Sequence, residues 1–162
     1  MMQDHTSHQE ASHAGQYAKF ALMMATSFVI MYAVMFLNVD RFGHVMLSPT
    51  RTYMTLLMIA PMAVTMMLFM WGMYKKKLWN YAILGVAVLT FAFCYAGLRE
   101  QWFISDVQWM KAMIPHHSSA IMVSEMAHLK DPEAIKLAEE IIKAQEKEIA
   151  EMQRMIYRLE NK

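Results

Sequence analysis

The chain has 162 residues, of which 57% are hydrophobic and only 18% charged, a composition too apolar for an average soluble protein of this length. The formal charge of +1 says nothing about an acidic partner, and the chain has no basic run suited to nucleic-acid binding. The single cysteine, Cys94, excludes an internal disulfide and a CxxC metal site.

Residues 1–18 form a polar tail that contains His5, His8 and His13. A short tail of this kind is typically disordered, although histidine-rich tracts also capture metals loosely. Residues 19–98 then make up a predicted membrane region. Its first span covers residues 20–37, which carry no charge and are long enough to cross a bilayer. No cleavage pattern follows this span, so we expect the chain to retain it.

The loop over residues 39–52 holds His44 and Met46, a weak candidate for a secondary metal site on an otherwise ordinary surface loop. Residues 53–74 form the second predicted span, with a mid-span kink expected at Pro61. Five methionines, every fourth residue from Met54 to Met70, follow a band that winds slowly around a helix. This band favours adaptable packing over the alternative, a thioether ladder that conducts Cu(I) through the membrane.

Three consecutive lysines, Lys75 to Lys77, separate the second span from the third, which we predict over residues 78–98. The positive-inside rule places this short loop in the cytoplasm. The amino terminus then lies inside and the carboxyl terminus outside the cytoplasmic membrane. Membrane lipid is therefore one expected partner.

Residues 99–162 are rich in charge and predict a water-facing helical hairpin, with helices over about 105–129 and 132–160. Ser105 and Asp131 are expected to cap the two helices, and Pro132 suits the first position of the second helix. Apolar residues at spacings of three and four define one face of the second helix: Ile135, Ala138, Ile142, Ile149, Met152 and Ile156.

The first helix of this hairpin carries the densest group of soft metal ligands in the chain. Met110, Met113 and His117 share one face, and Met113 and His117 are neighbours at i and i+4. His116 points away from that face unless Pro115 rotates it inward. Thioether and imidazole are suitable ligands for Cu(I), although such residues also occur simply as core. The candidate metal ligands are Met110, Met113, His116, His117, Met122, Met126 and His128.

The segment from Met110 to Met122, with its Met–Ile–Pro–His–His motif, resembles domain-of-unknown-function family 305, which is described as ferritin-like. Leu137-Ala138, Gln145 and Glu148-Ile149 support the resemblance in the second helix. Some family members look like secreted or periplasmic copper-binding proteins. The resemblance therefore implies a copper or silver site that includes Met113, His116 and His117.

The resulting fold prediction is all-α: three transmembrane helices followed by a two-helix hairpin outside the membrane. Because two helices cannot bury both faces of a hairpin, we expect a homodimer or higher oligomer built around a four-helix bundle. The leading function is a non-enzymatic, membrane-anchored protein that sequesters or hands over Cu(I) or Ag(I). The alternatives are a structural or assembly protein and a ferritin-like metal oxidase that uses the Glu125–His128 pair.

Overall fold

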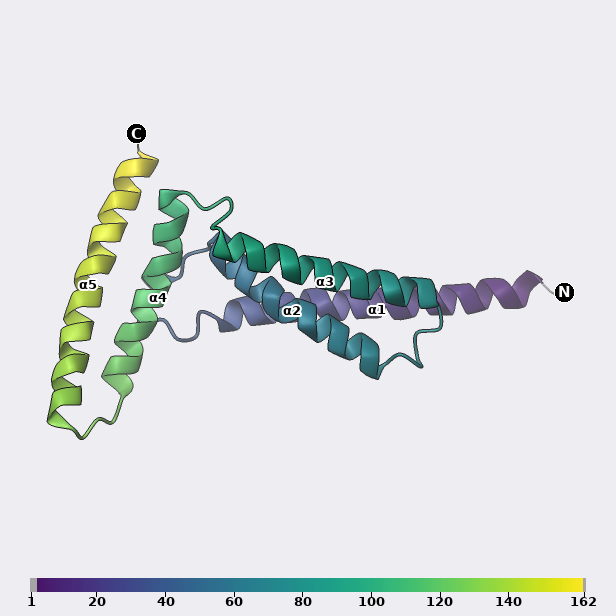
Figure 1. The fold of residues 1–162 in the computed structure, drawn as a ribbon, viewed down its shortest axis with the longest axis horizontal. Helices are drawn as coiled ribbons and strands as arrows, with labels where there is room; N and C mark the ends of the chain where they lie inside the picture. The colour runs from purple at the N-terminus through teal and green to yellow at the C-terminus, as the bar shows by residue number, and fades with distance from the viewer. Residues whose placement is uncertain (1–2, 162) are drawn as a thin grey trace. The chain divides into compact units, whose positions relative to one another are not determined.

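The computed structural model describes the backbone of residues 3–161 and the side chains of residues 15–161. The described chain is all-α, which confirms the predicted fold class (Figure 1). Its elements are α1 (Gln3–Val34), the short 3₁₀ helix η1 (Phe42–His44), α2 (Pro49–Phe69), α3 (Lys77–Arg99), α4 (Asp106–Met126) and α5 (Pro132–Glu160). They form two compact units: one of residues up to Tyr32 together with Tyr53–Glu100, the other of Ala33–Thr52 together with residues from Gln101 onward.

The first unit contains most of three helices that are long and apolar enough to cross a membrane: Gly15–Val34 within α1, Pro49–Phe69 and Lys77–Arg99. Three membrane-length helices were predicted, and their presence is confirmed. The second helix is shifted, since it begins at Pro49 and ends at Phe69 instead of covering residues 53–74. Proline is favoured in the first turn of a helix, which accounts for the earlier start.

Helix α1 extends well beyond the first apolar span, because its backbone is helical from Gln3 onward. The predicted polar tail therefore continues directly into the span as one helix. The side chains of His5, His8 and His13 lie outside the described residues, so the prediction of metal capture by this tail stays a prediction.

A buried polar network ties α1 to the turn between α2 and α3. The hydroxyl of Tyr17 donates to Asn80 Oδ1 at 2.7 Å and to the carbonyl of Lys76 at 3.0 Å. Asn80 is completely buried, and its Nδ2 donates to the carbonyl of Tyr74 at 2.8 Å. Because a buried amide needs partners for its polar atoms, this network fixes which part of α1 lies beside the turn.

The methionines from Met54 to Met70, along α2 and just beyond its end, pass from the surface of the first unit into its core. Met54 and Met58 are exposed, whereas Met66 and Met70 pack against a cluster that includes the fully buried Met67. This is the slow winding that a four-residue repeat produces on a helix with 3.6 residues per turn. The helix continues without interruption through Pro61.

The second unit is organised around the antiparallel hairpin of α4 and α5 (Figure 1). Ser105 accepts a hydrogen bond from the backbone N–H of Gln108 at 3.4 Å, and Asp131 accepts one from Ala134 at 2.9 Å. Both helices therefore begin at the expected caps. Helix α4 ends at Met126, earlier than predicted, because Ala127 takes an extended conformation and starts the turn that leads to Pro132.

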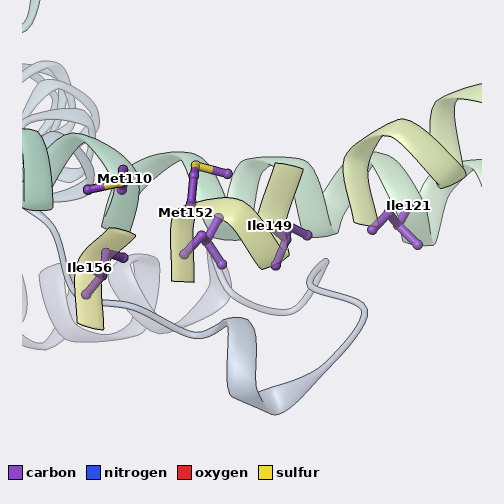
Figure 2. Packing of buried hydrophobic residues seen from close by; sticks show 6 residues of the cluster. Met110, Ile121, Ile149, Met152 and Ile156 are labelled. Atoms are coloured by element: carbon purple, nitrogen blue, oxygen red, sulfur yellow. The ribbon is translucent and has the colours of Figure 1, made fainter. Parts of the chain in front are cut away.

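The core of the hairpin is a single row of apolar side chains between the two helices. Figure 2 shows Met110 beside Ile156 at one end, followed by Met152 and Ile149, with Ile121 further along. The completely buried Ile114 belongs to the same cluster. The predicted apolar face of α5 forms this seam at Ile149, Met152 and Ile156. The seam holds the motif of α4 in a fixed orientation.

Candidate metal site on the helical hairpin

His117 is the candidate ligand with the best-defined surroundings. Its side chain is only 12% exposed, and both ring nitrogens have partners. Nδ1 lies 2.9 Å from the carbonyl oxygen of Met113, one helical turn earlier. Nε2 lies 2.7 Å from Glu148 Oε2 on α5. Because a carbonyl oxygen only accepts, Nδ1 carries a proton, and Nε2 is the nitrogen directed toward the second helix.

His116 has the opposite environment. It is exposed to solvent, and its ring centroid lies 6.2 Å from that of His117, with the two ring planes at 73°. Helix α4 continues through Pro115, which is itself buried, and the proline does not rotate His116 into the seam. The structure thus settles the orientation that the sequence had left open: His117 lies at the seam edge and His116 on the outside.

The three methionines nearest the histidines differ in how accessible their sulfur atoms are. Met110 is buried in the seam, where it packs with the apolar residues of α5. Met113 is half-buried and packs against the edge of the same cluster. Met122 is also half-buried, one turn beyond Ser118. The structure therefore brings Met113 next to His117 along the helix and uses Met110 as core.

The two remaining candidate ligands lie at the far end of the hairpin. Met126 is the last residue of α4 and is 68% exposed. The predicted helix over about 105–129 would have included His128, and this expectation is wrong, because α4 ends at Met126. His128 lies exposed in the turn toward α5. Because the helix ends between them, Glu125 and His128 also do not form the i, i+3 pair considered for a di-iron site.

Residues 38–46 dock onto α4 through the two serines that follow the histidine pair. The fully buried hydroxyl of Ser118 accepts a hydrogen bond from the backbone N–H of Asp40 at 2.8 Å and lies 2.9 Å from Nδ1 of His44. Ser119 Oγ accepts one from Asn38 Nδ2 at 2.7 Å. This docked segment fixes the side of α4 opposite to that of His117.

The two loop residues proposed as a secondary site both take part in this docking. Met46 packs against the hairpin core, and His44 faces Ser118. Burial lowers the pKa of His44, and this effect outweighs the carboxylate of Asp40, which raises the pKa; Arg41 lowers it further. When Nδ1 carries no proton, His44 accepts a hydrogen bond from the Ser118 hydroxyl, whose oxygen in turn accepts one from the backbone N–H of Asp40.

Sequence reasoning missed the contributions of Glu148 and Ser118 to this site. Glu148 was identified only as part of the resemblance, and Ser118 was given no role. The available signal was positional: Glu148 lies one residue before the buried Ile149, at the edge of the apolar face of α5. A carboxylate at such an edge is well placed to meet a histidine on the partner helix. Among the described residues, no group of three or more His, Cys, Asp and Glu side chains converges on one point.

The fold and this geometry define an all-α protein with three membrane-length helices and a hairpin that carries a histidine pair. The domain of unknown function DUF305 matches residues 98–156, which include the whole of α4 and most of α5. An uncharacterized protein of Acanthamoeba polyphaga mimivirus is 36% identical over 149 residues, covering 87% of this chain and 94% of the relative. The chain belongs to the DUF305 family. No solved structure matches it.

Proposed function

We propose that this protein is a membrane-anchored metal-binding protein that holds Cu(I) or Ag(I) outside the cytoplasmic membrane, for sequestration or handover and not for catalysis. His117 is the central ligand. His116 and Met113 are the next candidates, and Met122 and Met126 are candidates for a second, weaker thioether site.

One observation carries the proposal: the hydrogen bond between His117 Nδ1 and the carbonyl of Met113, at 2.9 Å. Metal-binding histidines typically donate one ring N–H to a carbonyl or carboxylate, which orients the other nitrogen as the ligand. This arrangement directs His117 Nε2 at the edge of the seam. A metal ion bound at Nε2 would take the place of the contact with Glu148, whose carboxylate would balance part of the charge of the ion.

The two imidazoles are neighbours on α4, with ring centroids 6.2 Å apart. The exposed His116 would change its rotamer to share an ion with His117, and Met113, next to His117, would supply a soft third ligand.

The location outside the membrane rests on the lysine-rich turn between α2 and α3. Lys75, Lys76 and Lys77 lie together in this turn, and the positive-inside rule assigns it to the cytoplasm. One further span, α3, then leads to the hairpin. The compartment beyond the cytoplasmic membrane is where the site would meet incoming copper.

Metal binding is tested on the purified full-length protein by titration with Ag(I), and with Cu(I) in competition with a colorimetric chelator. We expect His117→Ala to weaken binding at least tenfold, because it removes the oriented nitrogen. His116→Ala is expected to weaken binding less. His128→Ala is the matched control, since this histidine is exposed beyond the end of α4. The metal affinity of this variant should equal that of the wild type.

Equal affinities for the wild type and His117→Ala would contradict the proposal. A protein that binds neither ion, yet keeps its oligomeric state with and without chelator, would favour the structural or assembly alternative. The oxidase alternative predicts iron uptake after anaerobic loading. The ladder alternative predicts copper flux across vesicles that is lost in Met62→Leu and Met66→Leu.

A further inference from the structure

The hairpin has two long sides, and within the second unit the described residues cover only one of them. Residues 38–46 lie along one side, through Ser118 and through Arg41, whose guanidinium is 3.9 Å from Glu146. The His117–Glu148 pair lies at the edge of the opposite side. At about 100° per residue, that side is lined by two stripes of side chains, one along α4 and one along α5. We call it the open face and define it by Trp109, His116 and Val123 of α4 and by Leu137, Glu148 and Met155 of α5.

The open face is apolar and exposed. The exposed fractions are 49% for Trp109, 59% for Val123, 57% for Leu137 and 37% for Met155. The positions between them in the two stripes are small or uncharged except Glu151, so apart from the histidines the ionisable side chains between the ends are Glu148 and Glu151. A two-helix layer is stable when both of its faces are covered, so a partner for this face is expected.

Charge and size identify the partner as a second copy of the chain. None of the six residues that define the face is Lys or Arg, and Arg158 lies only at its end, beside the hollow lined by Trp109 and Met155, so the face lacks the row of basic residues with which a surface helix binds anionic lipid. A face as long as α4, about 31 Å, and two helices wide, about 20 Å, measures about 600 Å² in projection. Its corrugated accessible area is larger, close to the roughly 800 Å² per partner of a stable interface.

The pattern of the face is symmetric about His116. Helix α4 runs from residue 106 to residue 126, so its midpoint is (106 + 126)/2 = 116. Trp109 and Val123 each lie seven residues from this midpoint. Trp109 and Met155 line a hollow of about 490 Å³ at one end of the hairpin. The exposed Val123 and Leu137 lie toward the other end, and an antiparallel partner would bring them against that hollow.

We infer that two copies pair through the open face, with their α4 helices antiparallel, to form a four-helix bundle. Both His116–His117 pairs and both Glu148 carboxylates then lie at the centre of the bundle, where His116 of each copy is close to the two-fold axis. The metal site becomes complete only in the dimer. This last consequence rests on the proposed function, whereas the pairing itself depends only on the face.

The pairing is tested with full-length protein in nanodiscs, in the presence of a metal chelator. In the antiparallel register residue 112 of one copy meets residue 120 of the other, because 112 + 120 = 2 × 116. The double variant Ala112→Cys with Ala120→Cys should therefore give a covalent dimer with a short bis-maleimide. Each single variant is a control, since identical positions are then about 12 Å apart along the helices. The wild type, whose Cys94 is buried, is the background.

Substitutions on the face supply the second measurement. Val123→Glu or Leu137→Glu, added to the double-cysteine variant, should reduce the covalent dimer at least tenfold, because each buries a charge in an apolar interface. Tyr157→Glu is the matched control, since Tyr157 is 73% exposed on the outer side of α5, and cross-linking should persist. Circular dichroism checks that all variants keep their helix content.

Three outcomes would overturn the inference: a monomeric wild type, a double-cysteine variant that does not cross-link, or cross-linking that Val123→Glu leaves unchanged. Quenching of a fluorophore at Val123→Cys by brominated lipid would show that the face lies on the membrane instead, and would also overturn it. Loss of metal binding with intact cross-linking contradicts only the proposed function. Intact metal binding without cross-linking contradicts only the pairing.

Discussion

The hydroxyl of Ser118 joins three parts of the second unit within one hydrogen-bond distance: helix α4, the backbone of Asp40 and the ring of His44. Next to it, His117 joins α4 to α5 through Glu148. The adjacent residues His117 and Ser118 thus make their contacts on different sides of α4. The serine holds the docked segment, and the histidine presents a nitrogen at the seam.

Docking of residues 38–46 should weaken as the pH falls. Burial holds the pKa of His44 below the ordinary value of 6.5 that it has in the undocked chain. The undocked chain therefore binds a proton more readily, so the contribution of neutral His44 is fully present above about pH 6.5 and is lost as the pH falls through the lowered pKa. Amide hydrogen exchange of residues 38–46, corrected for its intrinsic pH dependence, should be faster at about pH 5.5 than at about pH 7.5.

His44→Asn provides the comparison for this pH effect, because the Oδ1 of asparagine is placed like the Nδ1 of histidine and accepts the same hydrogen bond without titrating. Its exchange should change less between the two pH values. Ser118→Ala should raise exchange at both, since it leaves the partly buried N–H of Asp40 without its acceptor, at a cost of about 1–3 kcal/mol. A wild type whose corrected exchange does not depend on pH would show that His44 does not control the docking.

At the scale of single helices, local sequence signals predicted the architecture well. The three- and four-residue spacing of Ile149, Met152 and Ile156 defined the seam of α5, and Asp131 with Pro132 defined its start. These features depend on residues within one or two turns of each other. The contacts that build the site do not: His117 and Glu148 are 31 positions apart, and His44 and Ser118 are 74. Periodicity carries no information about such pairs, so they were missed.

The seam should dominate the stability of the hairpin. Ile114 is completely buried between α4 and α5, whereas Ile135 near the start of α5 is 40% exposed. Ile114→Ala removes the same atoms as Ile135→Ala but leaves a cavity, and its expected cost is about 2–5 kcal/mol of unfolding free energy. Ile135→Ala should cost clearly less. Denaturant titration monitored by hydrogen exchange in α4 and α5 measures both; similar losses would mean that the seam is not the stabilising core.

At the scale of the whole molecule, most of the exposed apolar surface of the first unit belongs to its three long helices, for example at Val29, Phe69 and Leu89. In water such a surface would favour aggregation, whereas in a bilayer it is the expected exterior, in contact with lipid. The sequence revealed these helices because length and hydropathy alone define a span. It placed the bounds of α2 less well, since Pro49 and Gly72 act on the ends of a helix independently of hydropathy.

The lysines at Lys75 to Lys77 predict the direction in which the chain crosses the membrane, and this direction can be measured. Lys75→Cys should react with a membrane-impermeant maleimide only after the cells are opened, because the positive-inside rule predicts that the turn lies inside. Lys130→Cys, in the exposed turn between α4 and α5, should react in intact cells. The two variants control for each other's expression and reactivity, and the wild type reports any reaction of the buried Cys94. Labelling of Lys75→Cys alone in intact cells would place the hairpin in the cytoplasm. The histidine pair would then meet only cytoplasmic copper, and the proposed role outside the membrane would be wrong.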